Sequence, residues 1–245
     1  MSHYHFEIKS GTRGSTAEHV AYITRKGSHA KREDLIATEH GNMPEWAKDD
    51  PEIFWKASDK YERKNASPYR DITISLPNAL IPEQNVELAR DLMKVVAGSK
   101  PFQFAVHISD SSLEGESNPH VHAMISDRMP DGIERAPEQT FRRHDPIHPQ
   151  RGGRKKGSGG LNRMQMRDHV LSSRKIVADT INAALEKHGH DLRVDHRSLR
   201  EQGKQREPER YLGPARIRTM SDVQKKKHVS ERIFGRRADR KRTGT

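Results

Sequence analysis

Two histidines separated by one residue, His120 and His122, are the side chains of this chain best placed to do chemistry. They lie in residues 118–126 (NPHVHAMIS), a run typical of a β-strand that begins after an Asn-Pro turn. Successive side chains of a strand point to opposite faces, so both imidazoles share one face while Val121 points to the other. Two imidazoles one strand repeat apart can bind a single metal ion.

A third candidate ligand, His107, lies on the polar face of a second predicted strand, residues 101–109 (PFQFAVHIS). The polar, glycine-containing residues 110–117 suit a hairpin loop between the two strands. If the strands pair, three neutral imidazoles share a face and form an open metal site. The alternative is that these are ordinary solvent-facing side chains, since the chain has 15 histidines.

The composition predicts a basic protein with one modest core. Hydrophobic residues make up 31% of the 245 residues and charged residues 32%, and the net charge of +11 favours nucleic acid or another polyanion as partner. Positive charge is concentrated in the C-terminal stretch, at residues 225–227, 236–237 and 240–242. The absence of cysteine excludes disulfides and thiolate chemistry, and no apolar run is long enough to span a membrane.

The hydrophobic periodicity predicts an α+β fold with an antiparallel central sheet. Helices would pack on one face, and the other face would stay open, carrying the histidines and binding metal and DNA. The expected strands are residues 3–9, 71–77, 101–109 and 118–126, and the expected helices are residues 15–26, a segment from residue 50, residues 82–96 and residues 164–188.

A metal ion held on a basic sheet favours a reaction at a phosphate group. Such a reaction needs a nucleophile, and tyrosine is one candidate. The chain has five tyrosines, of which Tyr22 lies in a predicted helix close to Arg25 and Lys26. A phenol has a pKa of about 10 and is a poor nucleophile at neutral pH, but a nearby metal or cation favours the phenolate. The alternative is that Tyr22 simply packs in the helix.

Several short motifs together carry a family resemblance. They are residues 3–6 (HYHF), 21–27 (AYITRKG), 70–77 (RDITISLP), 106–108 (VHI), 118–128 (NPHVHAMISDR), 131–135 (DGIER), 189–191 (GHD) and 195–199 (DHRSL). In their order and spacing the chain resembles the nicking domain of MobA/MobL-type plasmid mobilisation relaxases, which are HUH endonucleases. The resemblance covers about residues 1–215, either as a small relaxase or as a fragment of a larger one.

The resemblance implies a transesterification on single-stranded DNA at an origin of transfer. Tyr22 would attack the scissile phosphate, leaving a 5′-phosphotyrosyl link and a free 3′-OH that can later be rejoined. His107, His120 and His122 would hold a divalent metal ion, Mg or Mn in the cell, with Zn, Co or Ni as further candidates. Asp71 would orient a histidine or help to deprotonate the tyrosine.

The distribution of charge, together with the resemblance, suggests which parts of the chain bind DNA. We expect residues 151–160 to be a flexible basic loop and residues 216–245 a flexible basic tail. The expected phosphate contacts are Arg25, Lys26, Arg128, Arg154, Lys155 and Lys156, with Arg128 equally suited to a structural ion pair. The expected partners are plasmid DNA, auxiliary mobilisation proteins and a coupling protein, in the bacterial cytoplasm and without membrane insertion. The role of residues 195–197 (DHR) stays open.

Three other functions are compatible with parts of the sequence. A rolling-circle replication initiator uses the same tyrosine and metal chemistry, and differs in nicking at a replication origin. A two-histidine phosphodiesterase needs a second His-x-Ser element beside residues 107–109, but His122 is followed by Ala123 and Met124. A non-catalytic basic DNA-binding module would keep all its activity after metal removal.

Overall fold

A five-stranded sheet forms the centre of the computed structural model, which describes residues 4–110, 117–204 and 212–231. The strand order is β1-β3-β5-β4-β2. The strands are β1 (Phe6–Ser10), β2 (Leu35–Gly41), β3 (Arg70–Ser75), β4 (Phe102–Asp110) and β5 (Ser117–Ile125). The pairs β1–β3, β3–β5 and β2–β4 are antiparallel, which confirms the predicted α+β fold with an antiparallel sheet.

Two long helices cover one face of this sheet. α3 (Pro82–Ala97) and α5 (Arg163–Lys187) contact each other and bury the side chains that alternate along β3 and β5, such as Ile72 and Val121. α3 begins with proline in its first turn and is followed by Gly98 at a φ of 57°, a left-handed conformation that favours glycine. Both helices were predicted from periodicity, and their bounds agree within a residue or two.

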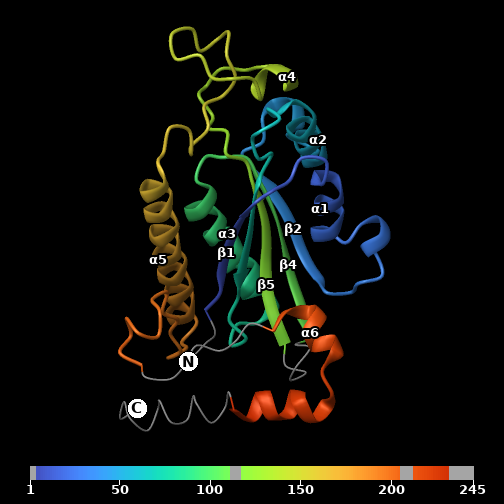
Figure 1. The fold of residues 1–245 in the computed structure, drawn as a ribbon, viewed down its shortest axis with the longest axis vertical. Helices are drawn as coiled ribbons and strands as arrows, with labels where there is room; N and C mark the ends of the chain where they lie inside the picture. Colours follow the sequence, from blue (N-terminus) through green and yellow to red (C-terminus); the bar gives the residue numbers. More distant parts are fainter. Residues whose placement is uncertain (1–3, 111–116, 205–211, 232–245) are drawn as a thin grey trace. The chain divides into compact units, whose positions relative to one another are not determined.

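The opposite face is also covered, so the prediction of helices on one face only is wrong. α1 (Thr16–Ile23) and α2 (Pro51–Tyr61) lie on the side of the sheet away from α3 and α5 (Figure 1). The cause is visible in the strands themselves, because Ala105 and Met124 share the histidine face and are fully buried in a second core cluster with Phe54. Apolar residues on both faces at this end of β4 and β5 require a cover on both faces.

Residues 152–154 are buried, within the segment 151–160 that the sequence predicts to be a flexible basic loop. Gly152 and Gly153 are buried, and a Cβ on Gly153 would lie 2.7 Å from the backbone nitrogen of Arg142. The Gly153 nitrogen donates to the Arg143 carbonyl, and the Arg154 nitrogen donates to the Thr140 carbonyl. Glycine serves here for close backbone approach, a role that a basic, glycine-rich composition does not reveal.

The chain falls into two compact units, residues 1–108 with 119–194, and residues 109–118 with 195–245. In the second unit α6 (Gly213–Thr219) is followed by helical residues 222–231. The described part of the predicted flexible tail is therefore helical, while residues 232–245 lie outside the described residues. Among the described helices, none is long and apolar enough to cross a membrane.

Candidate active site

Three imidazoles converge on the face of the sheet that carries α1. β4 lies next to β5, and the ring centroids of His107, His120 and His122 are 5.0–5.5 Å apart in all three pairs. On the neighbouring strand, Thr73 is the register partner of His122 and Ser75 that of His120. The predicted common face of the three histidines is present in the structure.

The protonation of these rings suits metal binding. Burial, with Arg25 as a second cause, lowers the pKa of His107 to about 4, and burial with the neighbouring imidazoles lowers that of His122 to about 3. Both rings are therefore neutral at neutral pH, and each keeps one nitrogen lone pair. The Ile23 carbonyl lies 2.8 Å from His107 Nε2 and accepts its proton, so the lone pair is on Nδ1.

The His107 Nδ1 atom is buried without a hydrogen-bond partner among the residues that the structure describes, and it lies 3.7 Å from Asp34 Oδ2. An orphaned lone pair beside two other imidazoles is the donor chemistry that a transition metal selects. Among the described residues, however, no group of three or more His, Cys, Asp or Glu side chains already has the geometry of a metal site. The residues fit a metal ion by type and proximity, and the rings must turn to coordinate one.

Tyr22 lies at the edge of this cluster, in the last turn of α1. Its half-buried ring meets the His122 ring edge-on at 5.7 Å and the His29 ring at 5.4 Å. Two guanidinium carbons lie over the same ring, Arg25 Cζ at 4.9 Å and Arg32 Cζ at 5.6 Å from its centroid. The phenol ring is therefore held between two guanidinium groups and the three imidazoles.

Arg25 holds this end of the helix. Its Nε and Nη2 atoms donate to the two Asp34 oxygens at 2.6 and 2.7 Å, and Nη1 donates to the Tyr22 carbonyl at 2.6 Å. The Arg25 guanidinium, opposed by burial, lowers the pKa of Asp34 to about 2. The backbone of Arg25 is left-handed, with a φ of 53°, and its side chain is 4% exposed. Arg25 therefore holds the Tyr22 backbone. The sequence predicts that Arg25 contacts a phosphate, but its buried, paired guanidinium is not free to do so.

Asp71 contacts a histidine that the sequence analysis missed. Its Oδ1 atom lies 3.1 Å from His19 Nε2, and the His19 ring stacks on Tyr69 at 5.2 Å and lies 6.1 Å from the Tyr22 ring. Although burial opposes it, the His19 hydrogen bond keeps the pKa of Asp71 below its usual value. A helical spacing of three residues from Tyr22 was the available signal for His19. Asp34 had no such signal.

The other predicted phosphate contacts divide into buried and exposed side chains. The Arg128 side chain is 3% exposed and pairs with Glu62 at 2.6 Å. Of its two expected roles, phosphate contact and structural ion pair, this geometry supports the ion pair. Lys156 pairs with the same carboxylate at 3.3 Å and donates to the Ser67 carbonyl, and Arg154 is 9% exposed. Lys26 and Lys155 are exposed, although Lys26 also contacts Glu52 at 2.6 Å.

A central antiparallel sheet with helices on both faces has a counterpart among solved structures. A chain from work on the molecular basis of vancomycin resistance transfer in Staphylococcus aureus shares this fold, with a TM-score of 0.58 over 80% of this chain and 98% of that one, at 22% identity. The chain belongs to the MobA/MobL family, whose model matches residues 12–222. The resemblance drawn from the motifs is thereby confirmed.

Two curated relatives are similar over most of this chain. It is 41% identical to a 43 kDa relaxation protein of Salmonella typhimurium over 210 residues, 84% of this chain and 57% of the relative. It is 36% identical to mobilization protein A of Escherichia coli over 220 residues, 87% of this chain and 30% of that protein. The chain thus spans about half or less of the length of these relatives.

Proposed function

We propose that this chain nicks and rejoins one strand of plasmid DNA at an origin of transfer, with Tyr22 as the nucleophile. The observation that carries the proposal is the position of the Tyr22 ring, 5.7 Å from His122 and at the edge of the three converging imidazoles. The MobA/MobL family membership and the relaxation and mobilization proteins among the relatives support it.

The reaction is a transesterification that conserves the phosphodiester. The Tyr22 oxygen attacks the scissile phosphorus, the bond from phosphorus to the 3′ oxygen breaks, and the 3′ oxygen leaves with a proton as a 3′-OH. The phosphate at the new 5′ end is then ester-linked to the tyrosine. Because one ester replaces another, the 3′-OH of a strand can reverse the step and reseal the DNA.

The residues around Tyr22 prepare it for attack. Arg25 Cζ and Arg32 Cζ lie over the ring, 4.9 and 5.6 Å from its centroid, and the charge of Arg32 favours negative charge on the phenol oxygen. Arg25 also fixes the backbone of the tyrosine through the Tyr22 carbonyl, so the nucleophile is held in place before DNA binds. His19, three residues before Tyr22 on α1 and paired with Asp71 of β3, is positioned to take part in moving the phenol proton.

A divalent ion held by His107, His120 and His122 would polarise the non-bridging phosphate oxygens and stabilise the charge that develops on them. Three imidazoles favour Mn, Co, Ni or Zn in affinity over Mg, whereas abundance in the cell favours Mg or Mn. The neutral state of His107 and His122 leaves their lone pairs available for that ion.

The proposal extends to the setting of the reaction. The substrate is single-stranded DNA at the origin of transfer, presented with the help of auxiliary mobilisation proteins, and a coupling protein receives the covalent complex. The reaction takes place in the bacterial cytoplasm, where plasmid DNA is found. The net charge of +11 supports a polyanionic substrate of this kind.

Mass spectrometry of the protein after incubation with candidate origin single strands tests the proposal. The wild-type protein should gain the mass of the 5′-phosphorylated product, and Tyr22→Phe should gain none while binding the strand as tightly as before. Tyr61→Phe is the matched control, because Tyr61 also lies under a cation, Lys60 at 4.9 Å, but on α2. A Tyr22→Phe protein that still forms the adduct would refute the assignment.

A further inference from the structure

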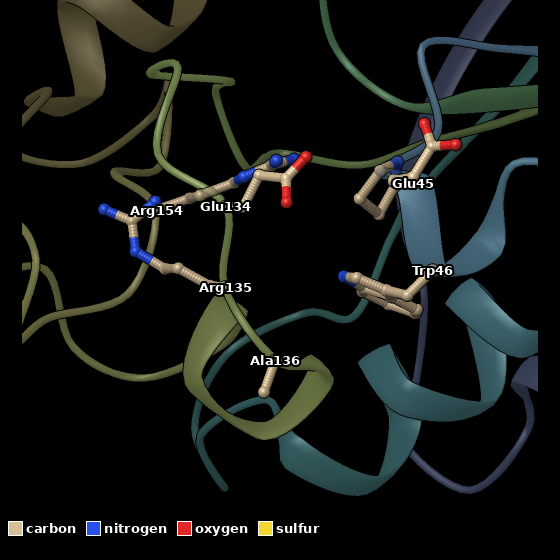
Figure 2. Close-up of a pocket in the computed structure, with 7 residues that line it drawn as sticks. Glu45, Trp46, Glu134, Arg135, Ala136 and Arg154 are labelled. Atoms are coloured by element: carbon tan, nitrogen blue, oxygen red, sulfur yellow. The ribbon is translucent and has the colours of Figure 1, made fainter.

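A pocket of about 530 Å³ lies between the segment before α2 and the segment around α4 (Pro137–Thr140). This volume is within the range of roughly 300–1,000 Å³ that small-molecule sites occupy. Figure 2 shows the Arg154 side chain extending into the space that separates it from Trp46 and Glu45. The lining residues are Pro44, Glu45, Trp46, Glu134, Arg135, Ala136 and Arg154.

Two of the lining side chains have buried hydrogen-bond donors without a partner. Arg154 is 9% exposed, and its Nε atom has no acceptor within the described part of the chain. The indole nitrogen of Trp46 is in the same state. Leaving a buried donor unpaired costs about 1–3 kcal/mol, and more for a charged group, so two in one pocket indicate an absent acceptor.

An arginine and a tryptophan close to the pocket, Arg135 and Trp55, have acceptors for their donors, in contrast to Arg154 and Trp46. Arg135 donates to both oxygens of Asp131 at 2.7 Å and to the carbonyls of Gly152 and Pro149. The indole nitrogen of Trp55 donates to Gln103 Oε1 at 2.9 Å. Side chains of the same two types, Arg135 and Trp55, thus have acceptors, whereas Arg154 Nε and the Trp46 indole nitrogen have none among the described residues.

The charges of the pocket select among possible ligands. Arg154 and Trp46 line the pocket and carry the buried donors, while the carboxylates of Glu45 and Glu134 are on exposed residues that line the same space. Two carboxylates repel a free phosphate dianion. A neutral, flat ring with acceptors on one edge and donors on another matches the pocket, because it meets the inner donors and the carboxylates at once.

We propose that this pocket binds one unstacked base of the DNA strand, with guanine as the preferred base. Guanine presents the O6 and N7 acceptors that arginine recognises, and its N1 and N2 donors suit a carboxylate. Unstacked bases bind to proteins through aromatic side chains and hydrogen bonds to their edges. This inference rests on the proposed function in one respect, namely that the bound base belongs to the DNA strand.

The pocket is joined to the candidate nucleophile by a continuous series of ring contacts. Successive centroids along it are 5.0–6.3 Å apart, so pocket and nucleophile belong to one packed layer on the histidine side of the sheet. A base bound in the pocket would thus set the position of the strand relative to the tyrosine. The rings in order are Trp46, Phe54, Trp55, Tyr69, His19 and Tyr22.

The chain contains its own probe for this pocket. It has two tryptophans, Trp46 in the pocket wall and Trp55, which is 1% exposed and reports only on the core. Titration of the full chain with deoxyguanosine should quench the indole fluorescence in a saturable way. Deoxyadenosine, deoxycytidine and thymidine should bind more weakly, inorganic phosphate should give no response, and Trp46→Phe should abolish the signal.

Arg154→Met should weaken deoxyguanosine binding by roughly tenfold, as expected for the loss of one bidentate arginine–guanine contact. This variant should fold as well as the wild type, because it removes a buried charge that has no ion-pair partner in the described chain. Arg135→Met is the matched control for folding, since it breaks the Asp131 pair and should lower the melting temperature. Glu134→Gln, on an exposed residue, should reduce the preference for guanine without affecting stability.

Two results would overturn the inference. One is the absence of any nucleoside-dependent change in Trp46 fluorescence, and the other is inorganic phosphate competing as well as deoxyguanosine, which would make the pocket an anion site. Neither result bears on the nucleophile, because nucleoside binding needs no cleavage and should be unchanged in Tyr22→Phe. Failure of adduct formation with intact deoxyguanosine binding would leave the pocket standing and remove the proposed function.

Discussion

Replacing Arg128 by methionine should destabilise the fold strongly and should not act through DNA. The side chain is 3% exposed, and its partner Glu62 is 1% exposed at 2.6 Å. The guanidinium also donates to three backbone carbonyls, those of Phe141, Arg142 and Arg154. All of these acceptors would lose a donor in a place that water does not reach.

The size of the effect follows from the burial of the pair. Removing one partner of a buried ion pair costs about 3–5 kcal/mol, because the remaining charge is left uncompensated. For a chain of this size each kcal/mol lowers the melting temperature by about 2–4 °C, so the expected decrease is roughly 6–20 °C. Lys156, 3.3 Å from the same carboxylate, offsets part of the charge and favours the lower half of that range.

Urea unfolding followed by circular dichroism, together with thermal melts, measures the change. Binding of single-stranded DNA should be assayed well below the unfolding midpoint, where we expect affinity within a few-fold of wild type. Glu62→Gln serves as the partner control, since it breaks the same pair from the acidic side and should also destabilise. A variant with an unchanged melting temperature and much weaker DNA binding would show instead that Arg128 contacts phosphate.

Three further predictions concern the metal, the packed loop and the tail. His122→Ala should weaken Mn binding measured by calorimetry and reduce nicking by orders of magnitude, whereas full nicking after exhaustive chelation would contradict the metal scheme. Gly153→Ala should lower the melting temperature because its Cβ meets the Arg142 backbone. Gly157→Ala should not, because its nearest contact is the end of the Lys100 side chain at 3.3 Å; equal melting temperatures would rule out the close approach. Deletion of the residues after Ser221 should reduce the slope of log affinity against log salt by about 0.7 for each lost phosphate contact. The preference for the nick site should remain, and its loss would make the tail a specificity element.

Strand alternation allowed much of the sheet to be predicted from sequence. The polar positions of residues 101–109 and 118–126 placed three histidines on one face, and the structure brings their ring centroids within 5.5 Å of each other. The same rule failed for β2, whose residues LIATEHG mix polar and small side chains at the edge of the sheet. An edge strand buries less than a central one, so its sequence carries a weaker pattern.

Interactions between distant segments could not be predicted from local sequence. Asp34 is recognisable only from its contacts with Arg25 and its position near His107, which come from different elements. Asp71 was expected to orient a histidine, but the contact is with His19 on α1 and not with a member of the cluster. Spacing along one helix or strand predicts which side chains share a face, whereas partners across elements depend on packing that spacing does not encode.

The net charge is a poor guide to where DNA binds, because part of it is used inside the protein. Arg25, Arg128, Arg135 and Arg154 are all at most 9% exposed and still count toward the value of +11. The first three have carboxylate partners, so their charge is neutralised locally and cannot release counterions from a phosphate backbone. Arg154 alone of these four has an unpaired donor, and that distinction separates arginines that stabilise the fold from one that is available to a ligand.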